Sequence, residues 1–182
     1  MIITLCGFMG AGKSTIGRNL ALLAGCQFID LDKEIEATSE CSISYLFSNY
    51  GERVFRKIEY DTLSKILEDS ISESENFLKE DYIQKVISLG GGTLTNVDST
   101  NLIKENSCCY YLKCTNNLLA KRLIKNHIHR PLLDGKTPEE IKEYINITMQ
   151  NREQVYISTA KKIIECDNKT ISQICEEILD SN

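Results

Sequence analysis

The stretch "GFMGAGKST", Gly7 to Thr15, decides the fold of this chain. It fits the pattern GxxxxGK[ST], follows an apolar run, Ile2 to Cys6, and opens a segment with helical periodicity, Ser14 to Leu23. Glycines there allow backbone N–H groups to face phosphate oxygens, and the N-terminus of the following helix adds partial positive charge. We therefore predict a P-loop that binds a nucleoside triphosphate.

The side chains of the predicted P-loop suit phosphoryl transfer. Lys13 can reach the β- and γ-phosphates, and the Ser14 hydroxyl can ligate magnesium. The expected ATP contacts of the loop are Gly10, Ala11, Gly12, Lys13, Ser14 and Thr15. The alternative is a glycine-rich turn without a ligand, which the position between a strand and a helix disfavours.

Composition limits the class of protein. The 182 residues, 42% of them hydrophobic, suffice for one core, and we expect a single domain. A net charge of -5 gives no general attraction to nucleic acid or to an anionic membrane. The eight cysteines contain no CxxC pair and are expected to be reduced, and the first residues lack a signal-peptide pattern. We expect a cytoplasmic monomer.

Apolar runs alternate with longer helical patterns along the chain, which is typical of an α/β fold with a parallel sheet covered on both faces. The predicted strands are 2–6, 27–29, 86–89, 109–112 and 162–165, and the predicted helices include 14–23, 43–50, 53–67, 116–125, 138–156 and 171–179. The acidic stretch Glu68 to Lys85 is interpreted as a surface excursion with its own marginal helix.

The sequence "FIDLD", Phe28 to Asp32, places two carboxylates at the carboxyl end of a predicted strand, where parallel α/β sheets bind ligands. One of these carboxylates could hold magnesium through water while the other accepts a hydroxyl proton. The alternative is that one of them caps the helix predicted from Lys33 to Thr38.

Two further motifs could contact an acceptor substrate. In "FRKIE", Arg56 and Glu59 share a helical face, so Glu59 either fixes Arg56 for bidentate binding of a carboxylate or forms a surface ion pair of little energy. In "SLGGG", Gly90 to Gly92 either expose backbone N–H groups to an anionic or hydroxylated substrate or form a tight turn.

The last third of the chain carries three further arginines of interest, Arg122, Arg130 and Arg152. Arg130 lies in "HRPLLDG", a polar connection between two helices that could act as a lid over the phosphates. Arg152 is followed at intervals of four by Tyr156 and Ala160, on a helix where it could also be merely solvated. A zinc site from Cys108, Cys109 and Cys114 with His127 and His129 is disfavoured against small buried hydrophobic residues.

In their order along the chain, these motifs resemble the shikimate kinase family over nearly the whole sequence. The motifs that carry the resemblance are the P-loop with "GRNLA", "DLD", "SISYLF", "FRKIE", "GGG", "RPLL" and the Arg152, Tyr156 and Ala160 spacing. The family implies a five-stranded parallel sheet in the P-loop NTPase fold of the nucleoside monophosphate kinase type. It also implies ATP- and Mg²⁺-dependent phosphorylation of the 3-hydroxyl of shikimate, a step of aromatic amino acid (chorismate) biosynthesis.

The resemblance also implies roles for individual residues. Lys13, Asp32 and Arg130 are the expected catalytic residues, with Ser14 and Asp30 at the metal and Arg122 and Arg130 on ATP. Shikimate is expected to contact Asp32, Arg56, Gly90, Gly91, Gly92 and Arg152, beside an apolar wall of Phe47 and Phe55. Within one kinase domain, 1–182, residues 7–15 form the P-loop, about 31–85 a helical substrate-binding region and about 124–137 the lid.

Two other functions share part of this pattern. A gluconate-type or nucleotide kinase would keep the P-loop without needing "FRKIE", "GGG" and the late arginine together. A catalytically silent nucleotide-binding regulator would have no need to retain Lys13, Asp32 and Arg130. The chain also departs from the family in Cys41, where glycine is common, and in the absence of a proline from the expected adenine-contacting loop, about Cys166 to Thr170.

Overall fold

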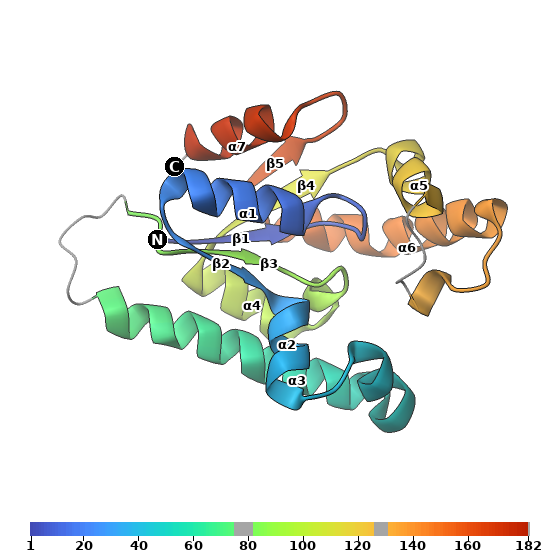
Figure 1. Ribbon diagram of the computed structural model, residues 1–182, viewed down its shortest axis with the longest axis horizontal. Helices are drawn as coiled ribbons and strands as arrows, with labels where there is room; N and C mark the ends of the chain where they lie inside the picture. Colours follow the sequence, from blue (N-terminus) through green and yellow to red (C-terminus); the bar gives the residue numbers. More distant parts are fainter. Residues whose placement is uncertain (75–81, 126–130, 182) are drawn as a thin grey trace.

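The structure, a computed structural model, describes residues 1–74, 82–125 and 131–181. Its centre is a sheet of five strands in the order β2-β3-β1-β4-β5, in which all neighbours run parallel (Figure 1). The strands are β1 (Ile2–Cys6), β2 (Gln27–Asp30), β3 (Lys85–Ser88), β4 (Cys108–Lys113) and β5 (Lys162–Glu165). This arrangement confirms the predicted five-stranded parallel sheet.

Helices cover both faces of this sheet (Figure 1). Helices α1 and α7 pack together on one face, whereas α4 and α6 pack together on the other and both contact β4. The helices are α1 (Lys13–Ala24), α2 (Leu31–Ser39), α3 (Ile43–Ser74), α4 (Val97–Asn106), α5 (Asn116–Lys125), α6 (Pro138–Thr159) and α7 (Ile171–Leu179), with short 3-10 turns η1 (Thr93–Thr95) and η2 (Pro131–Leu133). Within the described residues, no helix is both long and apolar enough to span a membrane.

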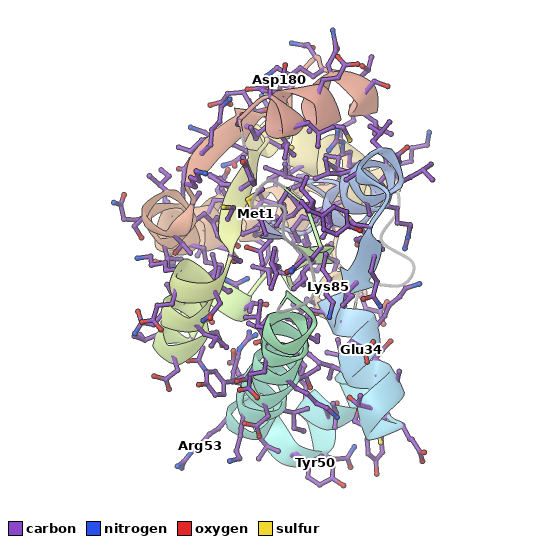
Figure 2. The ribbon with its side chains drawn as sticks, turned by 90° about the vertical axis from the view of Figure 1, so that its left-hand side faces the viewer. Met1, Glu34, Tyr50, Arg53, Lys85 and Asp180 are labelled. Carbon is purple, nitrogen blue, oxygen red and sulfur yellow. The ribbon has the colours of Figure 1, made fainter. Side chains whose placement is uncertain are left out.

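The central strands explain why the sequence shows continuous apolar runs. Every residue of β1 and β3 is buried, because both strands have a neighbour on each side and helices on each face. The chain start is fixed to this centre: the Met1 amino group donates to Tyr82 O at 2.6 Å, and Gln84 N donates to Met1 O at 2.8 Å. Figure 2 shows Met1 and Lys85 at the amino ends of these strands.

The long helix α3 joins two predicted helices across a break. Gly51 has φ 77° and ψ 169°, a non-helical conformation that separates the predicted segments 43–50 and 53–67.

The interpretation of Glu68 to Lys85 as a separate excursion is wrong at both ends. Residues up to Ser74 continue α3, because no Gly or Pro follows Gly51 to stop it and Leu63 and Leu67 anchor it in the core. At the other end, Lys85 opens β3 and is buried. Residues 75–81 lie outside the described part.

Candidate active site

The P-loop connects β1 to α1 and has the predicted strand-loop-helix context. Gly7, Gly10 and Gly12 have φ of 138°, 84° and 96°, and an added Cβ on Gly7 would lie 2.8 Å from Leu112 O. Residues with a side chain rarely adopt such positive φ values, and at Gly7 a side chain would also collide with the backbone of β4. These two constraints account for the glycine pattern. Lys13 Nζ donates to Gly7 O at 2.8 Å and to Phe8 O at 3.1 Å, so its ammonium group lies across the mouth of the loop.

A cavity of about 770 Å³ opens beside this loop. All six P-loop residues predicted to contact ATP line it, together with Asp30, Asp32, Ser88, Gly91, Arg122 and Lys169. The cavity therefore joins the P-loop to the carboxyl ends of β2 and β3. Arg56, Gly90, Gly92 and Arg152 are not among its lining residues, but Gly91, which accepts from Arg152, is one of them.

Three oxygen-bearing side chains meet at the start of α1. The Ser14 hydroxyl donates to Asp30 Oδ2 at 2.6 Å and lies 3.4 Å from Ser88 Oγ. Asp30 and Ser88 face each other in the register of β2 and β3, which is why residues far apart in the chain meet here. An all-oxygen set with one carboxylate suits a hard cation such as Mg²⁺. Asp30 occupies the N-cap position of α2 without a side-chain capping bond, so the capping alternative for Asp30 is wrong.

Asp32 lies in the first turn of α2, close to the glycine segment. An added Cβ on Gly90 would be 2.8 Å from Asp32 Oδ1, so a side chain at this position would displace the carboxylate. Burial raises the pKa of Asp32, the charge of Lys13 opposes this rise and the negative charges of Asp30 and Glu59 add to it, so that the pKa is about 6. A carboxylate whose pKa lies near neutrality is suited to general base catalysis.

Arg56 and Glu59 form a largely buried ion pair. Arg56 Nη1 donates to Glu59 Oε2 at 2.6 Å, and the two side chains are 15% and 1% exposed. The other carboxylate oxygen of Glu59 accepts from the Thr93 hydroxyl at 2.7 Å, so both ends of the carboxylate are fixed. The surface ion-pair alternative is therefore wrong, and Glu59 holds Arg56 in one orientation.

The glycine segment brings the two arginines together. An added Cβ on Gly92 would overlap the Arg56 guanidinium, and Gly91 O accepts from Arg152 Nη1 at 3.0 Å and from the Tyr156 hydroxyl at 2.6 Å. Two guanidinium groups thus contact neighbouring residues of the turn between β3 and η1. Nearby, the rings of Phe47 and Phe55 lie 4.5 Å apart, and Arg56 lies 5.1 Å from the centroid of Phe55.

Arg122 projects from α5 to the P-loop. Its Nη1 donates to Gly10 O at 3.0 Å and to Ala11 O at 3.3 Å, so it contacts the loop directly. The predicted lid is described only at its ends, because 126–130 lie outside the described residues. Arg130, His127 and His129 therefore have no placement here. In the remaining chain, no group of three or more His, Cys, Asp and Glu side chains is positioned to hold a metal ion.

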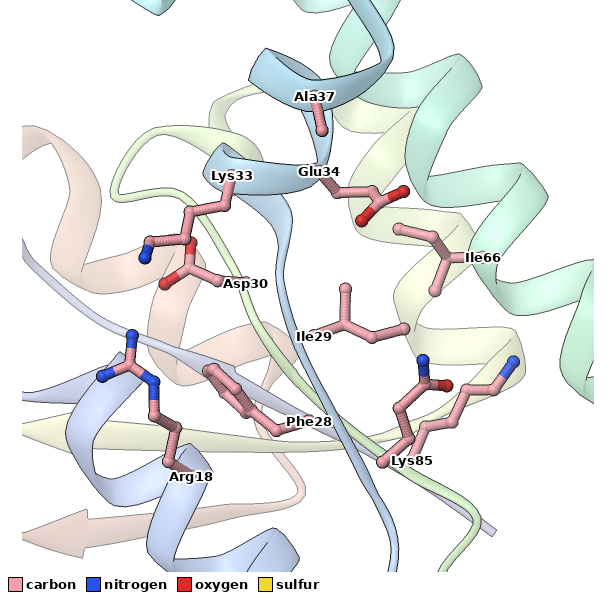
Figure 3. A pocket seen from close by; sticks show the side chains of 10 residues that line it. Arg18, Phe28, Ile29, Asp30, Lys33, Glu34, Ala37, Ile66 and Lys85 are labelled. Atoms are coloured by element: carbon pink, nitrogen blue, oxygen red, sulfur yellow. The ribbon is translucent and has the colours of Figure 1, made fainter.

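A second cavity, of about 500 Å³, crosses the edge strand β2 (Figure 3). Arg18 and Phe28 line one side, and Ile66 and Lys85 line the other (Figure 3). It shares only Asp30 and Lys33 with the P-loop cavity. It contains neither the P-loop nor Asp32, so we do not assign it to the candidate active site.

Sequence reasoning did not single out Ser88, Thr93 and Lys169. Ser88 could have been found only from the pairing of β2 with β3, and Thr93 only from the fold of the turn after Gly92. Lys169 lines the cavity from the loop after β5, where the sequence suggested base contacts without naming a side chain.

The sequence model of the shikimate kinase family matches residues 9–182 of the chain. Among similar proteins, the shikimate kinase of Chlorobium limicola is 40% identical, with 97% of this chain and 84% of that protein covered. The shikimate kinase of Flavobacterium johnsoniae is 35% identical, with 98% of this chain and 96% of that protein covered.

Solved structures of shikimate kinases have the same fold. The Bacteroides thetaiotaomicron enzyme superposes with a TM-score of 0.86 at 28% identity, covering 100% of this chain and 97% of the other. The Acinetobacter baumannii enzyme, solved in complex with shikimate, superposes with a TM-score of 0.82 at 29% identity, covering 99% and 91% of the two chains. The predicted fold, a P-loop NTPase of the nucleoside monophosphate kinase type, is confirmed.

Proposed function

The chain belongs to the shikimate kinase family, and from this premise we propose that it transfers the γ-phosphoryl group of ATP to the 3-hydroxyl of shikimate. The products are shikimate 3-phosphate and ADP. The observation that carries the proposal is the convergence of Asp32, Arg56 and Arg152 on the glycine segment beside a P-loop. The P-loop explains how the phosphoryl donor is bound. The convergence of one carboxylate and two arginines explains how a small hydroxylated acid is bound as the acceptor.

The donor side of the cavity binds ATP. The P-loop N–H groups and Lys13 hold the phosphates, and Arg122 binds the nucleotide from α5. Ser14 and Asp30 would hold a magnesium ion, and Ser88 lies within reach of the same oxygen cluster. When bound, magnesium neutralises phosphate charge during transfer.

The acceptor side binds shikimate. Arg56, fixed by Glu59, and Arg152, hydrogen-bonded to Gly91, clamp the carboxylate of the substrate, and Phe47 and Phe55 form its apolar wall. The other side of the ring lies against the glycine segment, Gly90 to Gly92. A side chain at Gly90 would meet Asp32, one at Gly92 would meet Arg56, and one at Gly91 would lie against Met9 N.

Asp32 is the general base of the proposed reaction. It accepts the proton of the attacking hydroxyl as the new P–O bond forms, while Lys13 stabilises the charge that develops on the transferring group. Arg130, from the lid of about 124–137, adds a further cation to ATP, besides Lys13 and Arg122. Residues of about 31–85 form the substrate-binding region within the single kinase domain.

We further propose that the protein acts in the cytoplasm as a monomer. Its eight cysteines are free thiols, which supports a reducing compartment. Light scattering of the purified protein tests the second point, and a mass near the 20.6 kDa of one chain is expected.

ADP release measured with alternative acceptors tests the function. Purified protein, ATP and magnesium are combined in turn with shikimate, gluconate and nucleoside monophosphates. We expect only shikimate to stimulate ADP release. Stimulation by gluconate or a nucleotide instead would identify another small-molecule kinase, and ATP binding without any stimulation would identify a silent regulator.

A further inference from the structure

Two cysteines lie side by side beneath the P-loop. Cys114 follows β4 and Cys166 follows β5, directly after the paired residues Lys113 and Glu165. Cys166 N donates to Lys113 O at 2.8 Å, so the pairing continues to these two residues. Neighbouring strands lie about 4.8 Å apart, within the range of about 4.4 to 6.8 Å between Cα atoms that a disulfide bridges.

The two thiol groups already interact, and one of them contacts the nucleotide site. The Cys114 and Cys166 thiols lie close enough for each to shift the pKa of the other, and the Cys166 thiol donates to Ile164 O at 3.3 Å. The Cys114 thiol also lies 3.8 Å from Ala11 O, to which it donates, and 3.7 Å from Arg122 Nη1. Because Arg122 itself donates to Gly10 O and Ala11 O, Cys114 belongs to the contacts that position both the P-loop and this arginine.

The surroundings make the two sulfur atoms unequal. The neighbouring Cys166 thiol and the charge of Arg122 lower the pKa of Cys114 against the effect of its burial, whereas the neighbouring Cys114 thiol and burial raise the pKa of Cys166. Cys114 is therefore the thiol that forms a thiolate, and Cys166 is the thiol that remains protonated beside it. Both are almost fully buried, with 4% and 1% exposure, so only a small oxidant reaches them without an opening of the structure.

We propose that Cys114 and Cys166 are a reversible oxidation site, at which a small hydroperoxide forms a disulfide that weakens binding of ATP. This inference rests on the proposed function, because it assigns ATP to the cavity beside Arg122. The effect on ATP follows from the contacts: the disulfide removes the thiol proton that Cys114 shares with Ala11 O and draws its sulfur toward β5.

Hydrogen peroxide oxidises the two thiols in two steps. The Cys114 thiolate attacks one peroxide oxygen, so that an S–O bond forms, the O–O bond breaks and hydroxide leaves with a proton as water. The Cys166 sulfur then attacks the Cys114 sulfur, forming the S–S bond and breaking the S–O bond, and a second water leaves. The two thiols lose two electrons and two hydrogens, and the peroxide is reduced to two waters. A dithiol reductant reverses the step.

Peptide mapping and calorimetry after peroxide treatment test the proposal. The full-length protein is oxidised with hydrogen peroxide, digested without reductant and mapped by mass spectrometry, and the Kd for MgATP is measured by calorimetry without shikimate. We expect a Cys114–Cys166 peptide two hydrogens lighter than the reduced pair. The Kd should rise about two- to tenfold, as for the loss of one or two hydrogen bonds, and return with dithiothreitol.

Variants assign this effect to the pair. In Cys114→Ser and Cys166→Ser, the Kd of each variant before and after peroxide is expected to be the same. In Cys26→Ser and Cys41→Ser, which remove more exposed thiols away from the P-loop, the rise is expected to persist. Cys166→Ala replaces Cys166→Ser if thermal unfolding shows that the serine variant is not folded.

Three results would overturn the proposal: absence of the Cys114–Cys166 peptide, its formation with an unchanged Kd, or a peroxide-dependent rise in Kd that survives in Cys166→Ser. None of these measurements uses shikimate. Failure of shikimate to act as acceptor therefore stays distinguishable from failure of the oxidation site.

Discussion

Asp30 and Asp32 are two residues apart, yet their surroundings assign them to different partners. Asp30 lies against the hydroxyl of Ser14 and opposite Ser88, on the donor side. Asp32 lies against Gly90, in the part of the site where Glu59 and Arg56 are fixed, and burial raises its pKa to about 6. The sequence predicted that the two carboxylates differ in role, and these different surroundings support that prediction. The pKa of Asp32 could not be predicted, because it depends on how deeply the side chain is buried.

Replacing Asp32 by Asn removes the base and keeps the shape. We expect Asp32→Asn to lower kcat by about 100-fold or more while the Kd for ATP changes less than about threefold, measured by steady-state kinetics and calorimetry. The folded-state pKa of Asp32 lies above its ordinary 3.8, so ionisation above about pH 6 destabilises the fold. The variant should therefore gain about 1 to 3 kcal/mol of unfolding free energy at pH 8. An equal loss of kcat and ATP affinity would contradict the role of Asp32 as base.

The pH dependence of the reaction follows from the same residue. Below about pH 6 Asp32 is protonated and cannot accept the hydroxyl proton, so kcat/KM for shikimate should fall about tenfold per pH unit there and level off above it. A profile that stays flat from pH 7 down to pH 5, measured with folded protein at each pH, would exclude Asp32 as the titrating base.

Arg56 is expected to act mainly on shikimate binding. Removing a charged bidentate contact should raise KM for shikimate about 10- to 100-fold in Arg56→Ala, with KM for ATP little changed. Arg53→Ala is a matched control, because Arg53 lies on the same helix but points to solvent (Figure 2). Since Arg56→Ala leaves Glu59 buried without its cation, its folding is checked by thermal unfolding, and Arg56→Lys serves as the second variant. Equal saturation by shikimate in wild type and variant would refute the clamp.

At the scale of elements, the turn from β3 to η1 is contacted by side chains from both α3 and α6. Arg56 from α3 and Arg152 from α6 both contact this turn, which leaves no room for a side chain at Gly92. The glycine segment therefore accommodates the guanidinium groups of two helices. A tight turn alone would not need glycine for that reason.

The neighbouring glycines make a direct test of this packing. An added Cβ on Gly92 overlaps the Arg56 guanidinium, whereas one on Gly91 lies 3.4 Å from Met9 N. Gly92→Ala should therefore raise KM for shikimate at least about fivefold more than Gly91→Ala, because it displaces Arg56. The opposite order in the kinetic comparison would mean that backbone exposure at Gly91, and not the position of Arg56, limits binding.

The sequence predicted elements unevenly, for physical reasons. Helix α4 was not predicted because Ser99 and Thr100 contribute to its buried face, so the apolar periodicity is weak. Its start could have been found, since Asn96 accepts from Asp98 N and Ser99 N as an N-cap. The break at Gly51 was found because glycine ended one periodic segment and another began soon after it.

At the scale of the whole molecule, the strand order assembles the site. Neighbours β2, β3 and β1 place the aspartates, the glycine segment and the P-loop at one edge of the sheet, and β4 leads to Arg122 (Figure 1). The P-loop, the aspartate pair and the glycine segment were readable from the sequence because each lies at the carboxyl end of a strand. The meeting of Ser14 with Ser88, and of Glu59 with Thr93, required the strand register and the turn conformation, which no local pattern contains.

The central claim is that this edge of the sheet transfers phosphate from ATP to one hydroxyl of shikimate. Phosphorus-proton correlation NMR of the product tests it most directly, because it identifies the ring carbon that carries the phosphate. We expect a single product with the phosphate coupled to the proton on carbon 3, formed together with ADP. A phosphate on another hydroxyl, or no phosphorylated shikimate while another acceptor is phosphorylated, would contradict it.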